Sequence, residues 1–454
     1  MTREPFLDLL DAATQTLQAE FAGLPEFAPA PGADAEAMAR VLAETAHRLG
    51  DNYPYFHPLY AGQMLKPPHP VARAAYALAM QINPNNHALD GGRASSAMEI
   101  EAVRAIAALF GWTEFLGHLT SSGTFANLES LWVAGQLRPG QRIVASEQAH
   151  FTHRRIGGVL RLEFAAIAAD ARGRMRLDAL EDELRQGGVG AVVATLGTTA
   201  MGAVDPLDEI LPLARRYGAR VHVDAAYGGY FGLIADALDA PARRAYAAIG
   251  AADSIAIDPH KHGLQPYGCG CVLLRDPAVG RFYQHDSPYT YFTSKDLHLG
   301  EISLECSRAG AAAVALWATQ RLLPLTNEGA FAEGLRRGRR AALDLDRRLR
   351  ADGRFVSLAA GPPELDIVVW AVRAARGEES SRRAREIFDA CARRDLHLAL
   401  VQLPAAWFDA HGCAAEQGAT LTCLRSVLMK PEHEAWMDAI WTRLLAACGE
   451  AGCG

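Results

Sequence analysis

The sequence predicts an α/β fold, with a mostly parallel sheet in a large domain and a smaller α/β domain at the C-terminal end. The chain of 454 residues is 50% hydrophobic and 21% charged, which is enough to bury a large core divided between domains. From residue 94 onward, short apolar runs alternate with amphipathic segments of helical length. Strands that alternate with helices across short loops are typical of a parallel sheet covered on both faces.

The N-terminal residues 1–60 are expected to form a helical segment, with a break rich in proline and alanine around residues 28–31. Residues 51–70 are rich in Tyr, Pro and His, which suits an extended segment that lines a cleft.

The large domain is expected at residues 61–330. Ligands of open α/β sheets bind at the carboxyl ends of the strands, so the residues that follow each strand are candidates for a site. The patterns predict helices at residues 99–110, 125–135 and 208–217, and strands at residues 118–120, 142–145, 191–196, 220–224, 254–257 and 270–274.

The smaller domain is expected at residues 331–454. A helical region rich in Ala and Arg runs from residue 304 to about residue 351. After it, residues 355–358, 366–372 and 420–427 have the apolar character of strands.

Composition and charge argue against several kinds of function. The net charge of -7 and the absence of a long basic run argue against nucleic-acid binding. The eight cysteines form no CxxC pair and no zinc-finger spacing, so we expect reduced thiols in a cytoplasmic protein and no metal site. Residues 1–20 lack a basic segment followed by an apolar one, and no apolar run is long enough to cross a bilayer, so neither secretion nor a membrane span is expected.

The chain has only four lysines, and Lys261 stands in Asp258-Pro259-His260-Lys261-His262, directly after a predicted strand. A lysine amine acts covalently mainly by condensing with a carbonyl, and desolvation and nearby positive charge favour the deprotonated form that does so. The commonest carbonyl partner is pyridoxal phosphate. An ordinary exposed lysine at a strand end is an equal alternative from this segment alone.

Two further motifs follow predicted strands. Ser122, Gly123 and Thr124 begin a predicted helix, where free backbone N–H groups and the helix dipole favour a phosphate, although a simple N-cap remains open. Asp224 ends an apolar strand and precedes small residues, among them Ala226, that would let a flat ring approach. A carboxylate there could hold a proton on a pyridine nitrogen, or could simply cap a helix.

His150 and Thr199 also follow predicted strands. The imidazole could stack on a cofactor ring and the hydroxyl could contact a ring substituent, although a structural histidine and a turn cap are the alternatives. The order of the four motifs along the chain carries more weight than any one of them: phosphate loop, stacking histidine, ring-nitrogen acid and Schiff-base lysine.

Three segments carry a resemblance to a known family: His222–Tyr227, Asp258–Lys261 and Leu196–Thr199. The sequence resembles the pyridoxal-phosphate-dependent (group II) amino acid decarboxylase family over roughly residues 55–431. Asn83-Pro84-Asn85-Asn86 and residues 304–310 make it most similar to the bacterial tyrosine, or aromatic amino acid, decarboxylase branch. The resemblance implies a type I fold like that of aspartate aminotransferases, pyridoxal 5'-phosphate as cofactor, and a homodimer with the active site at the interface.

The resemblance also implies roles for individual residues. Lys261 would form the Schiff base, Asp224 would pair with the pyridine nitrogen, and His150 and Ala226 would pack on opposite faces of the ring. The phosphate would be held by Ser122, Gly123, Thr124 and His260, with Thr199 near the ring. Asp258 departs from relatives that carry Asn, and an acid close to a phosphate would be repelled unless it points elsewhere.

The proton donor of the reaction is expected in a short segment between residues 286 and 308, where Tyr289 and Tyr291 are the candidates and His298 is a further one. If the donor is missing or replaced, oxidative deamination to an aldehyde or transamination can take the place of simple decarboxylation.

The expected activity is decarboxylation of an L-amino acid, with His57, Tyr60 and His87 lining the substrate pocket. The aromatic residues of this region favour an aromatic substrate such as tyrosine, although ordinary aromatic packing is the alternative. Aspartate or glutamate would need a carboxylate clamp, for which Arg93 is a candidate. An aldehyde synthase, a lyase, an aminotransferase and a catalytically silent binding protein of the same fold also remain open.

Overall fold

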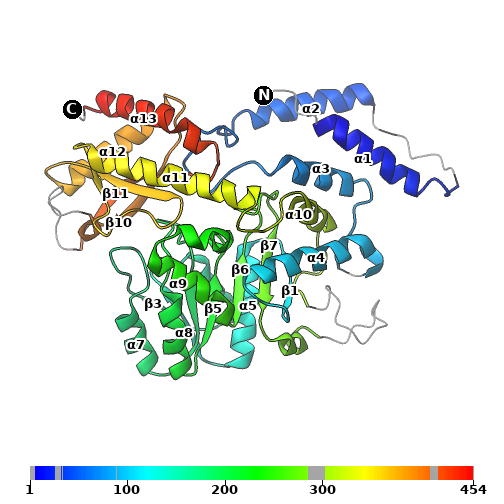
Figure 1. The fold of residues 1–454 in the computed structure, drawn as a ribbon, viewed down its shortest axis with the longest axis horizontal. Helices are drawn as coiled ribbons and strands as arrows, with labels where there is room; N and C mark the ends of the chain where they lie inside the picture. The colour runs from blue at the N-terminus through cyan, green and yellow to red at the C-terminus, as the bar shows by residue number, and fades with distance from the viewer. Residues whose placement is uncertain are drawn as a thin grey trace.

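A seven-stranded sheet forms the centre of the larger part of the molecule (Figure 1). Its strand order is β1-β7-β6-β5-β4-β2-β3. The computed structural model describes residues 6–25, 32, 34–87, 89–284, 302–408 and 418–452. The strands are β1 Leu116–Thr120, β2 Arg142–Ser146, β3 Phe164–Ile167, β4 Val189–Thr195, β5 Arg220–Asp224, β6 Ser254–Ile257 and β7 Gly270–Leu274.

Neighbouring strands from β3 to β6 run parallel, and β7 is antiparallel to both β1 and β6. The expected mostly parallel sheet is therefore confirmed. β3 was not predicted, because this partly buried edge strand has a short run rich in alanine, a residue that is depleted in strands.

Helices cover both faces of this sheet. On one face, α5 and α6 pack with Ala191 and Val193 of β4. On the other, α4, α7 and α8 pack with Val192 and Val221. These alternating contacts explain why every residue of β4 is buried. The helices of this part are α4 Arg93–Leu109, α5 Gly123–Leu137, α6 Thr152–Leu160, α7 Leu177–Arg185, α8 Leu207–Arg216, α9 Ala240–Ala248 and α10 Gly310–Leu322, with 3₁₀ turns η1 Leu89–Gly91, η2 Gly229–Ala237, η3 Ile249–Ala251 and η4 Pro277–Phe282.

A four-stranded antiparallel sheet forms the smaller C-terminal part, in the order β10-β11-β9-β8. β10 was not predicted, since only one of its two faces is well buried. The elements are β8 Phe355–Ser357, β9 Ile367–Val372, β10 Ala399–Pro404, β11 Thr420–Val427, the helices α11 Ala330–Ala351, α12 Gly377–Ala392 and α13 His433–Glu450, and the 3₁₀ turn η6 Ala405–Trp407.

The helical region expected from residue 304 to 351 is divided into α10 and α11. Pro324 stands between them, and proline disfavours helical geometry in the residue before it. α11 joins the two parts, because Phe331 and Leu335 lie in the core under the large sheet while Leu345 and Leu349 lie in the core of the small one (Figure 1). The division of the chain into domains at residues 60 and 330 stays a prediction.

The N-terminal helices α1 Phe6–Glu20 and α2 Ala35–Leu49 lie at the outer edge of the molecule, beyond α3 Pro70–Ala79 (Figure 1). Neither α1 nor α2 buries any residue. The expected break at residues 28–31 lies outside the described residues.

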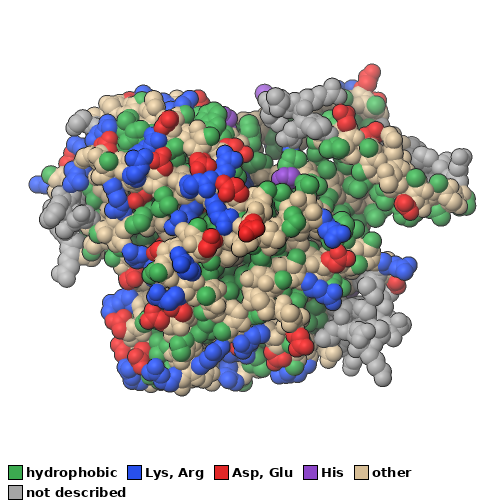
Figure 2. Space-filling model, in the orientation of Figure 1, with side chains coloured by type: hydrophobic (Ala, Val, Ile, Leu, Met, Phe, Trp, Pro, Cys, Tyr) green, Lys and Arg blue, Asp and Glu red, His purple; other side chains and the backbone are tan. Residues whose placement is uncertain are grey.

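Acidic and basic side chains are mixed over the face shown in Figure 2, with no single basic patch. Arg340, for example, pairs with both Glu333 and Glu434. No helix within the described ranges is long and apolar enough to cross a membrane. The same residues contain no cluster of three or more His, Cys, Asp or Glu side chains that could hold a metal ion.

Candidate active site

The carboxyl ends of the strands surround a cavity of about 180 Å³. A water molecule occupies roughly 30 Å³, so this cavity has room for an organic group. Every residue that the sequence predicted to bind the cofactor lines it: Ser122, Gly123, Thr124, His150, Thr199, Asp224, Ala226, His260 and Lys261. Five different strand ends contribute these residues, because parallel strands end at the same edge of a sheet.

Lys261 lies in a tight turn after β6, with its amine 3.0 Å from Oδ2 of Asp258. Asp258 therefore does not point elsewhere but lines the cavity with Lys261, and its buried Oδ1 has no hydrogen-bond partner among the described residues. A buried carboxylate needs a positive partner, which Lys261 supplies here. The turn requires Gly263, since a Cβ at that position would lie 2.5 Å from Cα of Pro259.

Asp224, at the end of β5, accepts a 2.8 Å hydrogen bond on Oδ2 from Nε2 of His153 and a 3.1 Å bond on Oδ1 from the Ala226 amide. Burial raises the pKa of Asp224, but the His153 hydrogen bond and the charges of His153 and Lys261 outweigh burial and lower this pKa below its ordinary value. The carboxylate therefore stays ionised inside the protein.

His153 was missed in the sequence. It lies fully buried in the first turn of α6, three residues after His150, and its Nδ1 forms no hydrogen bond within the described part of the chain. The only available signal was the spacing of two histidines at the start of a helix.

His150 accepts a hydrogen bond on Nδ1 from the Thr152 amide at 3.3 Å. Burial lowers the pKa of His150, the Asp224 charge opposes this, and the Lys261 charge adds to it. The imidazole is therefore neutral near pH 7, and a neutral ring can lie against a positively charged one without repulsion.

The N-terminus of α5 forms one end of the cavity. Ser122 caps it by accepting a 3.4 Å hydrogen bond from the Phe125 amide. A Cβ on Gly123 would lie 2.6 Å from the Asp258 carboxylate, so no side chain fits there. The backbone N–H groups of this first turn are suited to an anion.

His260 lies beside this helix end, and its ring packs on Tyr267 at 4.8 Å. Nδ1 lies 2.8 Å from the Cys269 carbonyl, so Nδ1 carries the proton and donates it. Burial lowers the pKa of His260 although the Asp258 charge opposes it, and Nε2 of the neutral ring lies 3.5 Å from Oδ2 of Asp258. A phosphate dianion next to Nε2 would raise this pKa and favour a proton there.

Thr199 belongs to the loop after β4, and this loop is held by Arg425 of β11. The Arg425 guanidinium donates to the carbonyls of Thr199 at 2.7 Å and Ala200 at 3.1 Å, and to the Gly62 carbonyl and the Gln63 side chain. Arg425 is 4% exposed, and all four acceptors are neutral. The sequence predicted no role for Arg425.

The predicted substrate residues lie elsewhere. His57 packs edge-on against Trp436 at 4.8 Å, Tyr60 packs edge-on against Tyr55 at 4.9 Å, and Arg93 is exposed at the start of α4. None of them, nor His87, lines the cavity formed by the described residues. In this single chain Tyr60 has the ordinary aromatic packing that was the alternative, and contact of these residues with a substrate stays a prediction.

Tyr289, Tyr291 and His298 lie outside the described residues. Residues on both sides of this segment meet at Glu129 of α5, because the Tyr283 hydroxyl donates to Oε2 at 3.0 Å and the Leu304 amide donates to Oε1 at 3.4 Å.

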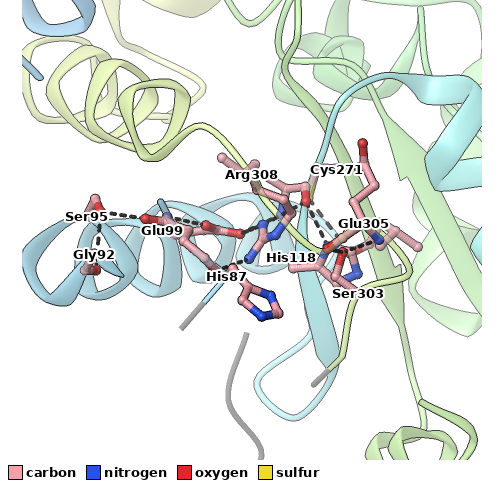
Figure 3. A network of polar contacts seen from close by, with 12 residues as sticks. His87, Gly92, Ser95, Glu99, His118, Cys271, Ser303, Glu305 and Arg308 are labelled. Atoms are coloured by element: carbon pink, nitrogen blue, oxygen red, sulfur yellow. Dashed lines mark hydrogen bonds and ion pairs between the residues drawn. The ribbon is translucent and has the colours of Figure 1, made fainter. Parts of the chain in front are cut away.

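A polar network fixes the residues that follow this segment (Figure 3). Arg308 forms an ion pair with Glu99 of α4 and donates to the Leu119 carbonyl at 2.9 Å. Glu305 accepts a 2.9 Å hydrogen bond from the Ser121 amide, next to the helix end at Ser122. His87 lies beside this network in Figure 3, and its amide donates a 3.0 Å hydrogen bond to Oδ1 of Asn85.

The sequence matches a family model and is similar to two bacterial decarboxylases. The sequence model described as the pyridoxal-dependent decarboxylase conserved domain matches residues 52–373. An L-tyrosine decarboxylase of Enterococcus faecium is 28% identical, with 64% of this chain and 64% of the relative covered. An L-2,4-diaminobutyrate decarboxylase of Rhizobium meliloti is 35% identical, with 68% of this chain and 64% of the relative covered. The chain thus spans a little under two thirds of the length of both relatives.

Among solved structures, the TDC of Oryza sativa, determined with PLP and tryptamine, superposes with a TM-score of 0.78 at 18% identity. The superposition covers 98% of this chain and 96% of that chain. At this level of identity the likeness shows a shared fold, and it confirms the fold class expected from the sequence.

Proposed function

The chain belongs to the pyridoxal-dependent decarboxylase family, and on this premise we propose that it converts an L-amino acid into its amine and carbon dioxide. The observation that carries the proposal is the meeting of Lys261, Asp224 and the N-terminus of α5 around one cavity. An amine, an acid and an anion-binding helix end match the aldehyde, the ring nitrogen and the phosphate of pyridoxal phosphate.

The residues around the cavity fit this cofactor. We assign the phosphate to the helix end, where Ser122, Gly123 and Thr124 line the cavity together with His260. Oγ1 of Thr195 and Oδ1 of Asp258 line the cavity without a hydrogen-bond partner among the described residues, as expected where a polar occupant belongs. We assign the ring to the space between His150 and Ala226, with Thr199 at its edge.

Lys261 supplies the amine that binds the aldehyde covalently. Asp258, 3.0 Å from this amine, orients it and accepts the proton that it must lose. When bound, pyridoxal phosphate supplies a protonated ring that accepts the electron pair left as the carboxylate departs.

Asp224 keeps a proton on the ring nitrogen, because its own pKa is too low to take that proton away. His153 holds Asp224 in place through the 2.8 Å hydrogen bond. His150, neutral at pH 7, excludes water from one face of the ring.

We assign Arg425 to the α-carboxylate of the substrate. Its guanidinium donates a hydrogen bond to the carbonyl of Thr199, a residue at the cavity edge. No ion pair joins Arg425 to an acid in the described part of the chain. A buried guanidinium is normally matched by an anion, and after its four hydrogen bonds one N–H of Nη2 is available to a substrate carboxylate.

We keep Tyr289 and Tyr291 as candidates for the group that delivers a proton to Cα after carbon dioxide leaves. Replacement of the true donor by Phe would slow amine release and favour an aldehyde. The test is to measure amine and aldehyde from a Tyr289→Phe and from a Tyr291→Phe variant. The variant that shifts its product from amine to aldehyde identifies the donor.

We propose an aromatic substrate, with tyrosine as the first candidate. The likeness to an L-tyrosine decarboxylase supports it. The likeness to an L-2,4-diaminobutyrate decarboxylase makes a short basic amino acid the second candidate. An acidic substrate remains a candidate, since the relatives include an aspartate 1-decarboxylase, but its side chain would need a partner other than Arg93, which is exposed and does not line the cavity.

We also propose that the active protein is a homodimer. The apolar residues Leu7, Leu9, Val41 and Leu42 of α1 and α2 are between 61% and 67% exposed, which is unusual for amphipathic helices. A second copy of the chain would cover them, and could bring His57, Tyr60 or His87 to the site of its partner.

The proposed function is tested by supplying the purified holoenzyme with each common L-amino acid and measuring carbon dioxide and amine together. We expect equal amounts of both from an aromatic amino acid. An aldehyde formed with consumption of oxygen would identify an aldehyde synthase, and a keto acid would identify an aminotransferase. If no amino acid gave any product, the protein would be catalytically silent.

A further inference from the structure

A second cavity, of about 490 Å³, begins one residue beyond Lys261. His262 and Leu264 form one wall, residues 66–73 another, the start of α11 a third, and residues 429–432 after β11 the fourth. None of the residues assigned to the cofactor or the substrate lines it.

Two of the four lysines of the chain, Lys66 and Lys430, line this cavity. Lys430 is only 3% exposed, and its amine donates to the Tyr60 carbonyl at 2.6 Å and lies 5.1 Å from the centre of the Tyr60 ring. The Lys66 amine lies 3.4 Å from the Met429 carbonyl. All of these partners are neutral, whereas Lys261 is the only lysine of the described residues in an ion pair with an acid.

Lys430 is buried and Lys66 is partly buried, and a positive charge removed from water without an anion is costly. Burial lowers the pKa of Lys66 to about 8, although Asp366 and Glu432 oppose it. Burial lowers the pKa of Lys430 to about 7, and repulsion from Lys66 adds to the effect. An anion between the two amines would relieve both the desolvation and the repulsion.

The other charged and titratable groups around the cavity leave it positive. They are His69, Arg73 and His262, the exposed Glu432 at its rim, and Asp366 behind His262. His262 is 2% exposed, and its Nδ1 has no hydrogen-bond partner in the described ranges. An unsatisfied buried nitrogen at the wall is a second indication that a polar occupant is missing.

The rest of the wall is apolar and includes Phe331, Leu335 and Met429. We propose that this cavity is a binding site for a small organic anion, whose carboxylate or phosphate head lies between Lys66 and Lys430 and whose body lies against this apolar wall.

The site is separate from the cofactor cavity. Tyr227 lines the cofactor cavity and donates a 2.6 Å hydrogen bond to Oδ1 of Asp366, whose Oδ2 lies 3.4 Å from Nε2 of His262. These three buried side chains form the partition between the two cavities. An anion at the lysines therefore does not compete with the phosphate of a bound cofactor.

The proposal is tested by calorimetric titration of the holoenzyme with benzoate, whose charge is constant between pH 6 and 9. We expect saturable binding that weakens as the pH rises across this range, because the lysines lose their protons. Lys430→Gln and Lys66→Gln should each weaken binding about tenfold or more, as expected for the loss of a charge-assisted hydrogen bond. Inorganic phosphate serves as a second probe, for the anionic head alone.

Arg104→Gln is the matched control, because it removes a positive charge from the exposed face of α4 and should leave benzoate binding unchanged. Lys430→Arg keeps the charge and should retain binding within a few-fold. Circular dichroism and the absorbance of the bound cofactor check that each variant is folded, and Lys66→Gln carries the test if Lys430→Gln does not fold. Absence of saturable binding, or binding that both Gln variants leave unchanged, would overturn the proposal.

Discussion

Nε2 of His153 donates a 2.8 Å hydrogen bond to Oδ2 of Asp224, and both side chains are buried. The bond joins the start of α6 to the end of β5 across a sequence separation of 71 residues. It is the contact that keeps Asp224 ionised although burial alone would raise its pKa.

Removal of this hydrogen bond tests His153 as a positioning residue. In His153→Leu, burial would act on Asp224 without its partner, so the pKa of Asp224 would rise. We expect kcat to fall about 10- to 100-fold, the equivalent of about 1.5 to 3 kcal/mol for a hydrogen bond to a charged group. The acid limb of the kcat profile should also move to higher pH. His153→Gln, which keeps an N–H donor, should restore most of the activity, and an unmoved acid limb in His153→Leu would contradict the role.

Asp224→Asn tests the charge itself. The amide keeps the shape of the side chain but cannot hold a proton on a ring nitrogen. We expect the variant to bind pyridoxal phosphate, seen by absorbance, and to lose nearly all turnover. Turnover close to that of the unaltered protein would show that Asp224 does not have this role.

Gly123→Ala tests the helix end as the phosphate site. The new Cβ would lie 2.6 Å from the Asp258 carboxylate, so either the carboxylate or the helix end must move. Overpacking of this kind costs about 1 to 3 kcal/mol, which corresponds to a loss of cofactor affinity of about 5- to 140-fold. Gly158→Ala in α6 is the control, because a Cβ there meets no atom within 4 Å. Equal cofactor affinity of the two variants would contradict the assignment.

The residues assigned to the cofactor could be predicted from the sequence to line one cavity because each one ends a strand or stands within four residues after it. In a parallel sheet the strand ends meet at one edge, so the order of the motifs predicts that Ser122, Asp224 and Lys261 come together without any knowledge of packing. The central strands could be predicted for a different reason. They are buried on both faces, and such strands appear in the sequence as continuous apolar runs.

The partners of these residues could not be predicted in the same way. His153 and Arg425 reach the site through the packing of α6 on the large sheet and of the small sheet on the loop after β4. Such contacts depend on tertiary geometry, which leaves no periodic pattern. The location of His57 and Tyr60 could not be predicted either. An aromatic-rich segment has the same composition whether it lines a pocket or packs on other aromatic rings, as these two residues do here.

His222 makes stability depend on pH. Its ring bonds to Asn127 at 2.7 Å and to Ser254 at 2.9 Å, and burial lowers its pKa to about 3. In the unfolded chain the pKa is about 6.5, so the unfolded chain alone binds a proton between these values. The free energy of unfolding should therefore fall as the pH drops below about 6.5, by about 2 kcal/mol at pH 5 from this residue. Urea unfolding at pH 7 and pH 5 measures the free energy of unfolding at each pH. Between these two values His222→Gln should lose about 2 kcal/mol less of this free energy than the unaltered protein. His47→Gln, at an exposed position of α2, should keep the full loss, and an equal loss in both variants would refute the assignment.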